Sequence, residues 1–159
     1  MRDGSHDFDF LIGSWQTRYR RLRAPLSGSQ EWYECEGTSV VRSFWDGNGN
    51  IENGDLHCPE QYVRSMTLRL YNESSHEWSL YWGTQAAGLA MPPQVGHFDE
   101  DGVGEFFARD TFGDKPIIVR YRWTKLQGDR PHFEQAFSPD DGTTWETNWI
   151  CDYSRNESI

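Results

Sequence analysis

The chain has little positive charge and no long apolar run. Its 159 residues include 15 Lys and Arg against 25 Asp and Glu, a formal net charge of −10. A surface of this sign repels phosphate backbones and anionic lipids. No stretch approaches the roughly 18 apolar residues that span a bilayer, and no apolar signal-peptide core precedes Asp7. We therefore expect no nucleic acid and no membrane as partners, and a cytoplasmic location.

Familiar reaction motifs are missing as well. The sequence has no Cys-x-x-Cys, His-x-His or His-Glu-x-x-His spacing, no Gly-x-Ser-x-Gly and no phosphate-binding loop. Local spacing therefore predicts no metal site. The three cysteines, Cys35, Cys58 and Cys151, are odd in number and far apart, which favours three reduced thiols over a disulfide framework.

Aromatic side chains supply much of the apolar area. Only 36% of the residues are hydrophobic, yet the chain has 8 Trp, 7 Tyr and 9 Phe. Large flat rings in this number suit a wall around a cavity. A length of 159 residues fits one domain, which we expect to span residues 1–159.

The chain opens with a predicted short helical plug that leads into a strand. Asp7 is placed to cap one helical turn, and Gly13 frees the backbone to turn into the strand. The turn has an apolar side formed by Phe8, Leu11 and Ile12. After Gly13 the period becomes two, and one face, expected to point inward, consists of Trp15, Thr17, Tyr19 and Arg21.

The rest of the chain reads as short strands separated by turns. The predicted strands are residues 31–45, 51–56, 65–71, 78–83, 94–98, 105–111, 117–125, 132–137 and 145–153. Their regular spacing is typical of an antiparallel barrel or sandwich, and no helix longer than about two turns is needed. Two longer loops, residues 23–30 and 85–93, are candidate lids.

The opening motif Phe-Asp-Phe-Leu-Ile-Gly-Ser-Trp, followed by an all-strand chain, resembles the calycin superfamily of lipocalins, fatty-acid-binding proteins and nitrobindin-like barrels. Within it, the chain resembles a lipocalin-like β-barrel family of unknown function. The resemblance implies an all-β, up-and-down antiparallel barrel of 8–10 strands with a short N-terminal helical plug. Because such barrels host carriers, haem proteins and a few enzymes, it implies no single activity.

We expect the barrel to bind a small, largely apolar molecule, either aromatic or acidic, in its interior. Rings with a polar tip and a few polar anchors are the usual lining of such a site. An arginine on an inward face would anchor a carboxylate, unless it forms a salt bridge across the barrel, as Arg109 could with Glu105. The candidate ligand-binding residues are Trp15, Tyr19, Arg21, Tyr33, Trp82, Arg109, Tyr121, Gln135 and Trp149.

Two alternatives use the same cavity. The first is a cofactor-free lyase, isomerase or cyclase, with Glu105, Tyr19 or His57 as acid or base. The second is haem binding: the resemblance to nitrobindin implies a haem-ligating histidine on a late strand, where His132 is the candidate, although it shares a face with residues expected to point outward. The preferred hypothesis needs no cofactor and no metal. A homodimer is possible in each case.

Overall fold

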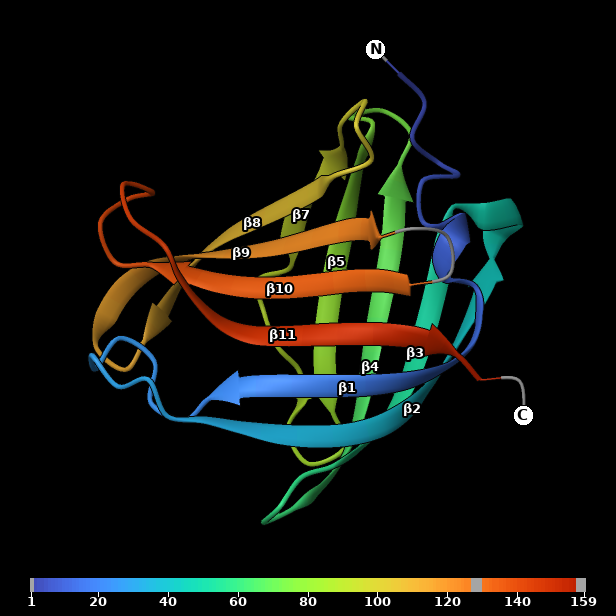
Figure 1. The fold of residues 1–159 in the computed structure, drawn as a ribbon. Coiled ribbons are helices and arrows are strands. Elements are labelled where there is room, and N and C mark those ends of the chain that lie inside the picture. The colour runs from blue at the N-terminus through green and yellow to red at the C-terminus, as the bar shows by residue number, and fades with distance from the viewer. Residues whose placement is uncertain (1, 127–129, 157–159) are drawn as a thin grey trace.

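Ten antiparallel strands close into a barrel in the computed structural model, which describes residues 2–126 and 130–156 (Figure 1). The barrel strands are β1 (Gly13–Leu22), β2 (Trp32–Phe44), β3 (Gly49–His57), β4 (Tyr62–Asn72), β5 (Glu77–Thr84), β7 (Gln94–Phe98), β8 (Gly104–Phe112), β9 (Lys115–Leu126), β10 (Arg130–Ser138) and β11 (Glu146–Arg155). An eleventh, two-residue strand, β6 (Gly88–Leu89), pairs with the end of β5. The described segments contain helical structure only as the 3-10 turns η1 (Asp9–Leu11) and η2 (Trp45–Gly47).

Each barrel strand pairs with the next one along the chain, and β1 pairs with β11 to close the ring. The register places Tyr19 opposite Cys35 on one side and opposite Cys151 on the other. Side chains alternate between the two faces of each strand, so these three residues point into the barrel together. The predicted all-β, up-and-down barrel is confirmed, and all ten predicted strands are present.

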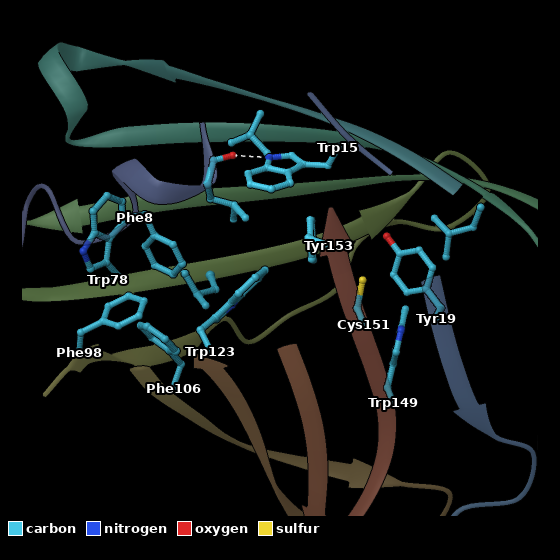
Figure 2. Close-up of a cluster of buried hydrophobic side chains, with 14 of the residues drawn as sticks. Phe8, Trp15, Tyr19, Trp78, Phe98, Phe106, Trp123, Trp149, Cys151 and Tyr153 are labelled. Carbon is cyan, nitrogen blue, oxygen red and sulfur yellow. Dashed lines mark hydrogen bonds between the residues drawn. The ribbon is translucent and has the colours of Figure 1, made fainter. Parts of the chain in front are cut away.

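The plug closes one end of the barrel. Phe8 and Leu11 are almost fully buried, and the indole Nε1 of Trp15 donates a hydrogen bond to the Leu11 carbonyl over 2.8 Å. Figure 2 shows Phe8 among the rings of Trp78, Phe98, Phe106 and Trp123, where several ring pairs meet edge to face. The predicted cap is wrong, because Asp7 forms an ion pair with Arg2 while Phe8 occupies the N-cap position of η1 without a side-chain bond.

A bulge changes the orientation of the start of β11. Gln135 pairs with Trp149, but the next residue of β10, Ala136, pairs with Thr147, so Asn148 is an extra residue. Trp149 therefore points inward as expected. Trp145, which the predicted strand placed on the same face, instead contacts Phe107 on the outer wall, with 6.1 Å between ring centroids.

Cys35 and Cys58 form a disulfide, so the prediction of three free thiols is wrong. The two cysteines are 23 residues apart in the sequence, but pairing of β2 with β3 places Glu36 opposite His57 and brings the adjacent cysteines to a Cα–Cα distance of 4.3 Å. Cys151 is free and buried. Disulfides persist mainly in oxidising compartments, so this bond does not support the predicted cytoplasmic location. That location stays a prediction. In the described part of the chain, no helix has the length and hydropathy to cross a bilayer.

Candidate functional site

The barrel interior contains two adjoining spaces. We call the first, about 50 Å³ in volume, the inner cavity; it lies mid-barrel and includes Tyr19, Trp123 and Cys151 in its wall. The second, about 190 Å³, we call the vestibule; it lies at the end of β1 opposite the plug, where Arg21 stands. Four side chains line both spaces: Trp82, Tyr121, Gln135 and Trp149.

The vestibule has an apolar wall with a few polar groups. Val119 and Phe137 belong to its wall, while Ala90 and Pro92 from the 85–93 loop lie at its edge. This loop is fastened to β5, because the Ala90 N–H donates to the Trp82 carbonyl over 2.7 Å. The second predicted lid loop therefore does lie at the mouth. The first, residues 23–30, contributes no lining residue and is held to β11 by a bond from the Leu26 N–H to the Glu146 carboxylate.

Two polar side chains of the vestibule form no hydrogen bond or ion pair with another described residue. The Arg21 guanidinium carbon lies 4.1 Å from the centroid of the Trp149 ring, and Arg21 forms no ion pair with any described carboxylate. The side chain of Gln94 is unpaired among the described residues, although Gln94 is only 6% exposed. Buried amides are normally hydrogen-bonded, so this amide is available to a polar group in the vestibule. Asp110, on β8, is the acidic residue of the vestibule.

A buried polar network separates the inner cavity from the plug. The Glu52 carboxylate accepts hydrogen bonds from Arg69, from Ser39 Oγ at 2.5 Å and from the Tyr153 hydroxyl at 2.7 Å. Arg69 also donates to Asn50 Oδ1 over 2.8 Å. The Arg69 guanidinium lies between the Phe8 and Trp123 rings, 5.2 and 5.3 Å from their centroids. This network was not predicted from the sequence.

Two titratable groups of the inner cavity wall, the Tyr19 hydroxyl and the Cys151 thiol, are held in their neutral forms. Burial raises the pKa of the Tyr19 hydroxyl well above its ordinary value, and the negative charges of Cys151 and Glu52 would raise it further. Burial likewise raises the pKa of the Cys151 thiol. At neutral pH Tyr19 is therefore a hydrogen-bond donor or a general acid rather than a base, and Cys151 is not a thiolate.

The structure brings six of the predicted ligand-binding residues together. Arg21 lines the vestibule, Tyr19 lines the inner cavity, and the other four are the residues common to both spaces. Trp15 and Tyr33 belong to inward faces but line neither space. Trp15 is fully buried beneath the plug against Tyr153, and Tyr33 packs under the Arg23 guanidinium.

Two predicted residues of β8, Arg109 and Glu105, lie on the outer wall. Arg109 forms an ion pair with Asp141 at 2.9 Å and is exposed, so neither the inward position nor the pairing with Glu105 applies. Glu105 lies instead 4.0 and 3.9 Å from Arg120 and Arg122. The reason is strand parity, since the inward positions of β8 are taken by Phe106 and Ala108, both buried.

Histidines are absent from the two interior spaces in the described part of the chain. His57 is exposed and stacks on Tyr62 at 4.8 Å. His132 is held on the outer wall between Asp152, 2.6 Å from Nδ1, and Glu134, 3.0 Å from Nε2. The residues present therefore do not fit a haem in the barrel with His132 as its ligand. No cluster of potential metal-ligating side chains occurs among residues 2–126 and 130–156.

Comparison with known proteins supports the fold. No protein-family model matches the chain, and no curated protein matches it significantly. Among solved structures, the S-type phycobiliprotein lyase from Guillardia theta superposes with a TM-score of 0.64 at 12% sequence identity, over 99% of this chain and 95% of that chain. Identity this low shows a shared fold alone. Together with the closed ring of antiparallel strands, it defines the fold as an antiparallel β-barrel similar to that of the lyase.

Proposed function

We propose that this protein binds a small aromatic acid in the vestibule, with the ring against Trp82, Tyr121 and Trp149 and the carboxylate on Arg21. The proposal depends mainly on the surroundings of Arg21. Its guanidinium stacks on an aromatic ring at the edge of a mostly apolar space and forms no ion pair with a described carboxylate. A guanidinium matches a carboxylate with two parallel hydrogen bonds. Gln94 supplies a further unpaired polar group at the same site.

The volume limits the ligand to about one ring. An engineered cavity of about 150 Å³ in another protein binds benzene, and the vestibule offers about 190 Å³. A benzoate-sized molecule fits this space, whereas a haem or a long-chain fatty acid would extend out of it. The inner cavity, at about 50 Å³, leaves room for one additional substituent.

An enzyme acting in the same cavity is the second candidate. The observation in its favour is that the Tyr19 hydroxyl, kept protonated by its raised pKa, and the Glu52 carboxylate both belong to the inner cavity wall. A proton donor and a carboxylate facing one substrate are the elements of acid–base catalysis in a lyase or isomerase. The structurally similar protein from Guillardia theta is named a phycobiliprotein lyase, but at 12% identity it supports the shared fold and no particular reaction in this chain.

Binding is tested by titrating the protein with benzoate and phenylacetate, using calorimetry and tryptophan fluorescence. Toluene and benzyl alcohol are the matched neutral probes. We expect the acids to bind and to quench fluorescence, since Trp82 and Trp149 line the vestibule. Failure of both acids to bind at millimolar concentration, or equal binding of the neutral probes, would refute the proposal. The enzyme hypothesis predicts that Tyr19→Phe abolishes turnover of a bound substrate while binding is retained.

A further inference from the structure

The wall of the inner cavity contains buried hydrogen-bond donors that have no acceptor among the described residues. Three N–H groups of its lining residues are buried without a partner among the described residues: Arg69 Nε, Trp123 Nε1 and Trp149 Nε1. Buried indole N–H groups normally find an acceptor, and leaving one unpaired costs about 1–3 kcal/mol. Figure 2 shows the Trp149 nitrogen on the ring edge that faces Tyr19 and Cys151, toward the interior.

The carboxylate of the cavity wall, Glu52, is already in use. Both Glu52 oxygens accept hydrogen bonds, one from Arg69 and the other from Ser39 and Tyr153. Because the buried Arg69–Glu52 pair is neutral overall, the cavity favours an uncharged acceptor over a second anion. A volume of about 50 Å³ suits a carbonyl-sized group or a few water molecules.

The spacing between Arg21 and the inner cavity matches the length of one substituted aromatic ring. Tyr19 lines the inner cavity, Arg21 lines the vestibule, and the two residues are successive inward positions of β1. Two residues of strand span about 7 Å. This distance is close to the length of a benzene ring that has substituents at opposite ends, so one ring can place a carboxylate at Arg21 and a second group in the inner cavity.

We propose that the ligand is an aromatic acid whose para substituent has a hydrogen-bond-accepting oxygen, and that this oxygen binds the unpaired indole N–H groups in the inner cavity. The inference rests on the proposed function and specifies its ligand class. The ligand carboxylate contributes affinity through Arg21 at the barrel mouth. The oxygen in the inner cavity contributes specificity for the para substituent, because a ligand without this oxygen leaves the buried donors unpaired.

The test compares 4-formylbenzoate with 4-vinylbenzoate, which have nearly the same shape but differ in the acceptor oxygen. Calorimetry on the wild-type protein is expected to show about tenfold tighter binding of the formyl compound. Trp123→Phe, which removes one of the donors, is expected to reduce that ratio severalfold. Trp145→Phe is the matched control, because Trp145 packs on the outer wall against Phe107, and it should leave the ratio unchanged.

A measurement on the unaltered protein avoids dependence on the folding of a variant. In ¹⁵N-correlated NMR spectra, 4-formylbenzoate should shift the indole N–H resonances of Trp123 or Trp149 downfield, and 4-vinylbenzoate should not. Equal affinity of the two acids with no such shift would overturn the inference and leave the proposed function intact, since water would then satisfy the donors. Absence of binding by either acid would refute both.

Discussion

Arg21 and Trp149 form a stacked pair at the mouth of the barrel, with the guanidinium carbon 4.1 Å from the ring centroid. The two residues are opposite each other in the pairing of β1 with β11. Stacking holds the planar guanidinium in one orientation, which lowers the conformational entropy that is lost when it binds a carboxylate. The pair is therefore a preorganised anion anchor next to the ring-binding wall.

Replacing Arg21 should separate the effect of its charge from that of its geometry. We expect Arg21→Met to weaken benzoate binding by about 30-fold, and Arg21→Lys by about tenfold, because lysine keeps the charge but neither the fork nor the stacking. Calorimetry at constant ionic strength measures both. Arg20→Met is the control, since Arg20 is exposed on the other face of β1. Equal losses in the Arg20 and Arg21 variants would mean a nonspecific charge effect.

Asp110 should act against an acidic ligand. It lines the vestibule on β8, across the barrel mouth from Arg21 on β1, and it forms no ion pair within the described residues. Asp110→Asn removes a like charge from a solvent-exposed position, and we expect benzoate to bind about two- to threefold more tightly. The gain should disappear above roughly 0.5 M salt. Weaker binding in Asp110→Asn would instead indicate a ligand with a positively charged group.

The sequence was sufficient to predict the barrel because most strands show a clear two-residue alternation with a turn at each end. Inward positions predicted for β1, such as Trp15 and Tyr19, are buried as expected. The alternation fails at Asn148, where one extra residue reverses the faces, and nothing in the local sequence marks that bulge. The disulfide depends on cross-strand register, which the spacing of Cys35 and Cys58 does not reveal.

The inward face of β4 shows why the buried network was not found. One face of this strand is apolar and resembles a core face; it consists of Met66, Leu68 and Leu70. The other face, with Thr67 and Arg69, is the one that points inward, and Arg69 is 1% exposed. A buried guanidinium is stable there because its partners come from β3, as Glu52 and Asn50. The only sequence signal was the shared polarity of these alternate positions on two neighbouring strands.

The Glu52 carboxylate should be essential for stability. Glu52→Gln leaves the Arg69 charge buried without an anion and places an amide where three donors converge. We expect a loss of about 3–5 kcal/mol in the free energy of unfolding, measured by urea denaturation at pH 7. Glu36→Gln removes an exposed carboxylate, 3.7 Å from Arg18, and should change stability by less than about 1 kcal/mol. A similar small change in both variants would contradict a structural role for the network.

Because Cys35 and Cys58 form a disulfide, we expect one free thiol, that of Cys151, to react with a thiol reagent in the unfolded, unreduced chain. A thiol assay in guanidinium should count one thiol before reduction and three after it. Reduction, or the double change Cys35→Ser and Cys58→Ser, should lower the free energy of unfolding by about 3 kcal/mol, because the cross-link restricts the unfolded chain. Three reactive thiols before reduction would show that the bond does not form.

The buried Cys151 thiol should make the protein less stable at alkaline pH. Its pKa is raised in the folded state by burial, whereas in the unfolded chain it ionises near pH 8.5. The folded state therefore keeps a proton that the unfolded state releases, so stability falls as the pH rises above 8.5. At pH 9.5 the loss from this group is on the order of 1 kcal/mol. The measurement is urea unfolding of wild type and Cys151→Ser between pH 7 and 9.5. Tyr19 and Tyr153 titrate in both proteins, so their contribution cancels, and the variant should show a flatter pH profile. Identical profiles would mean that the thiol ionises equally in both states and is not shielded by the barrel.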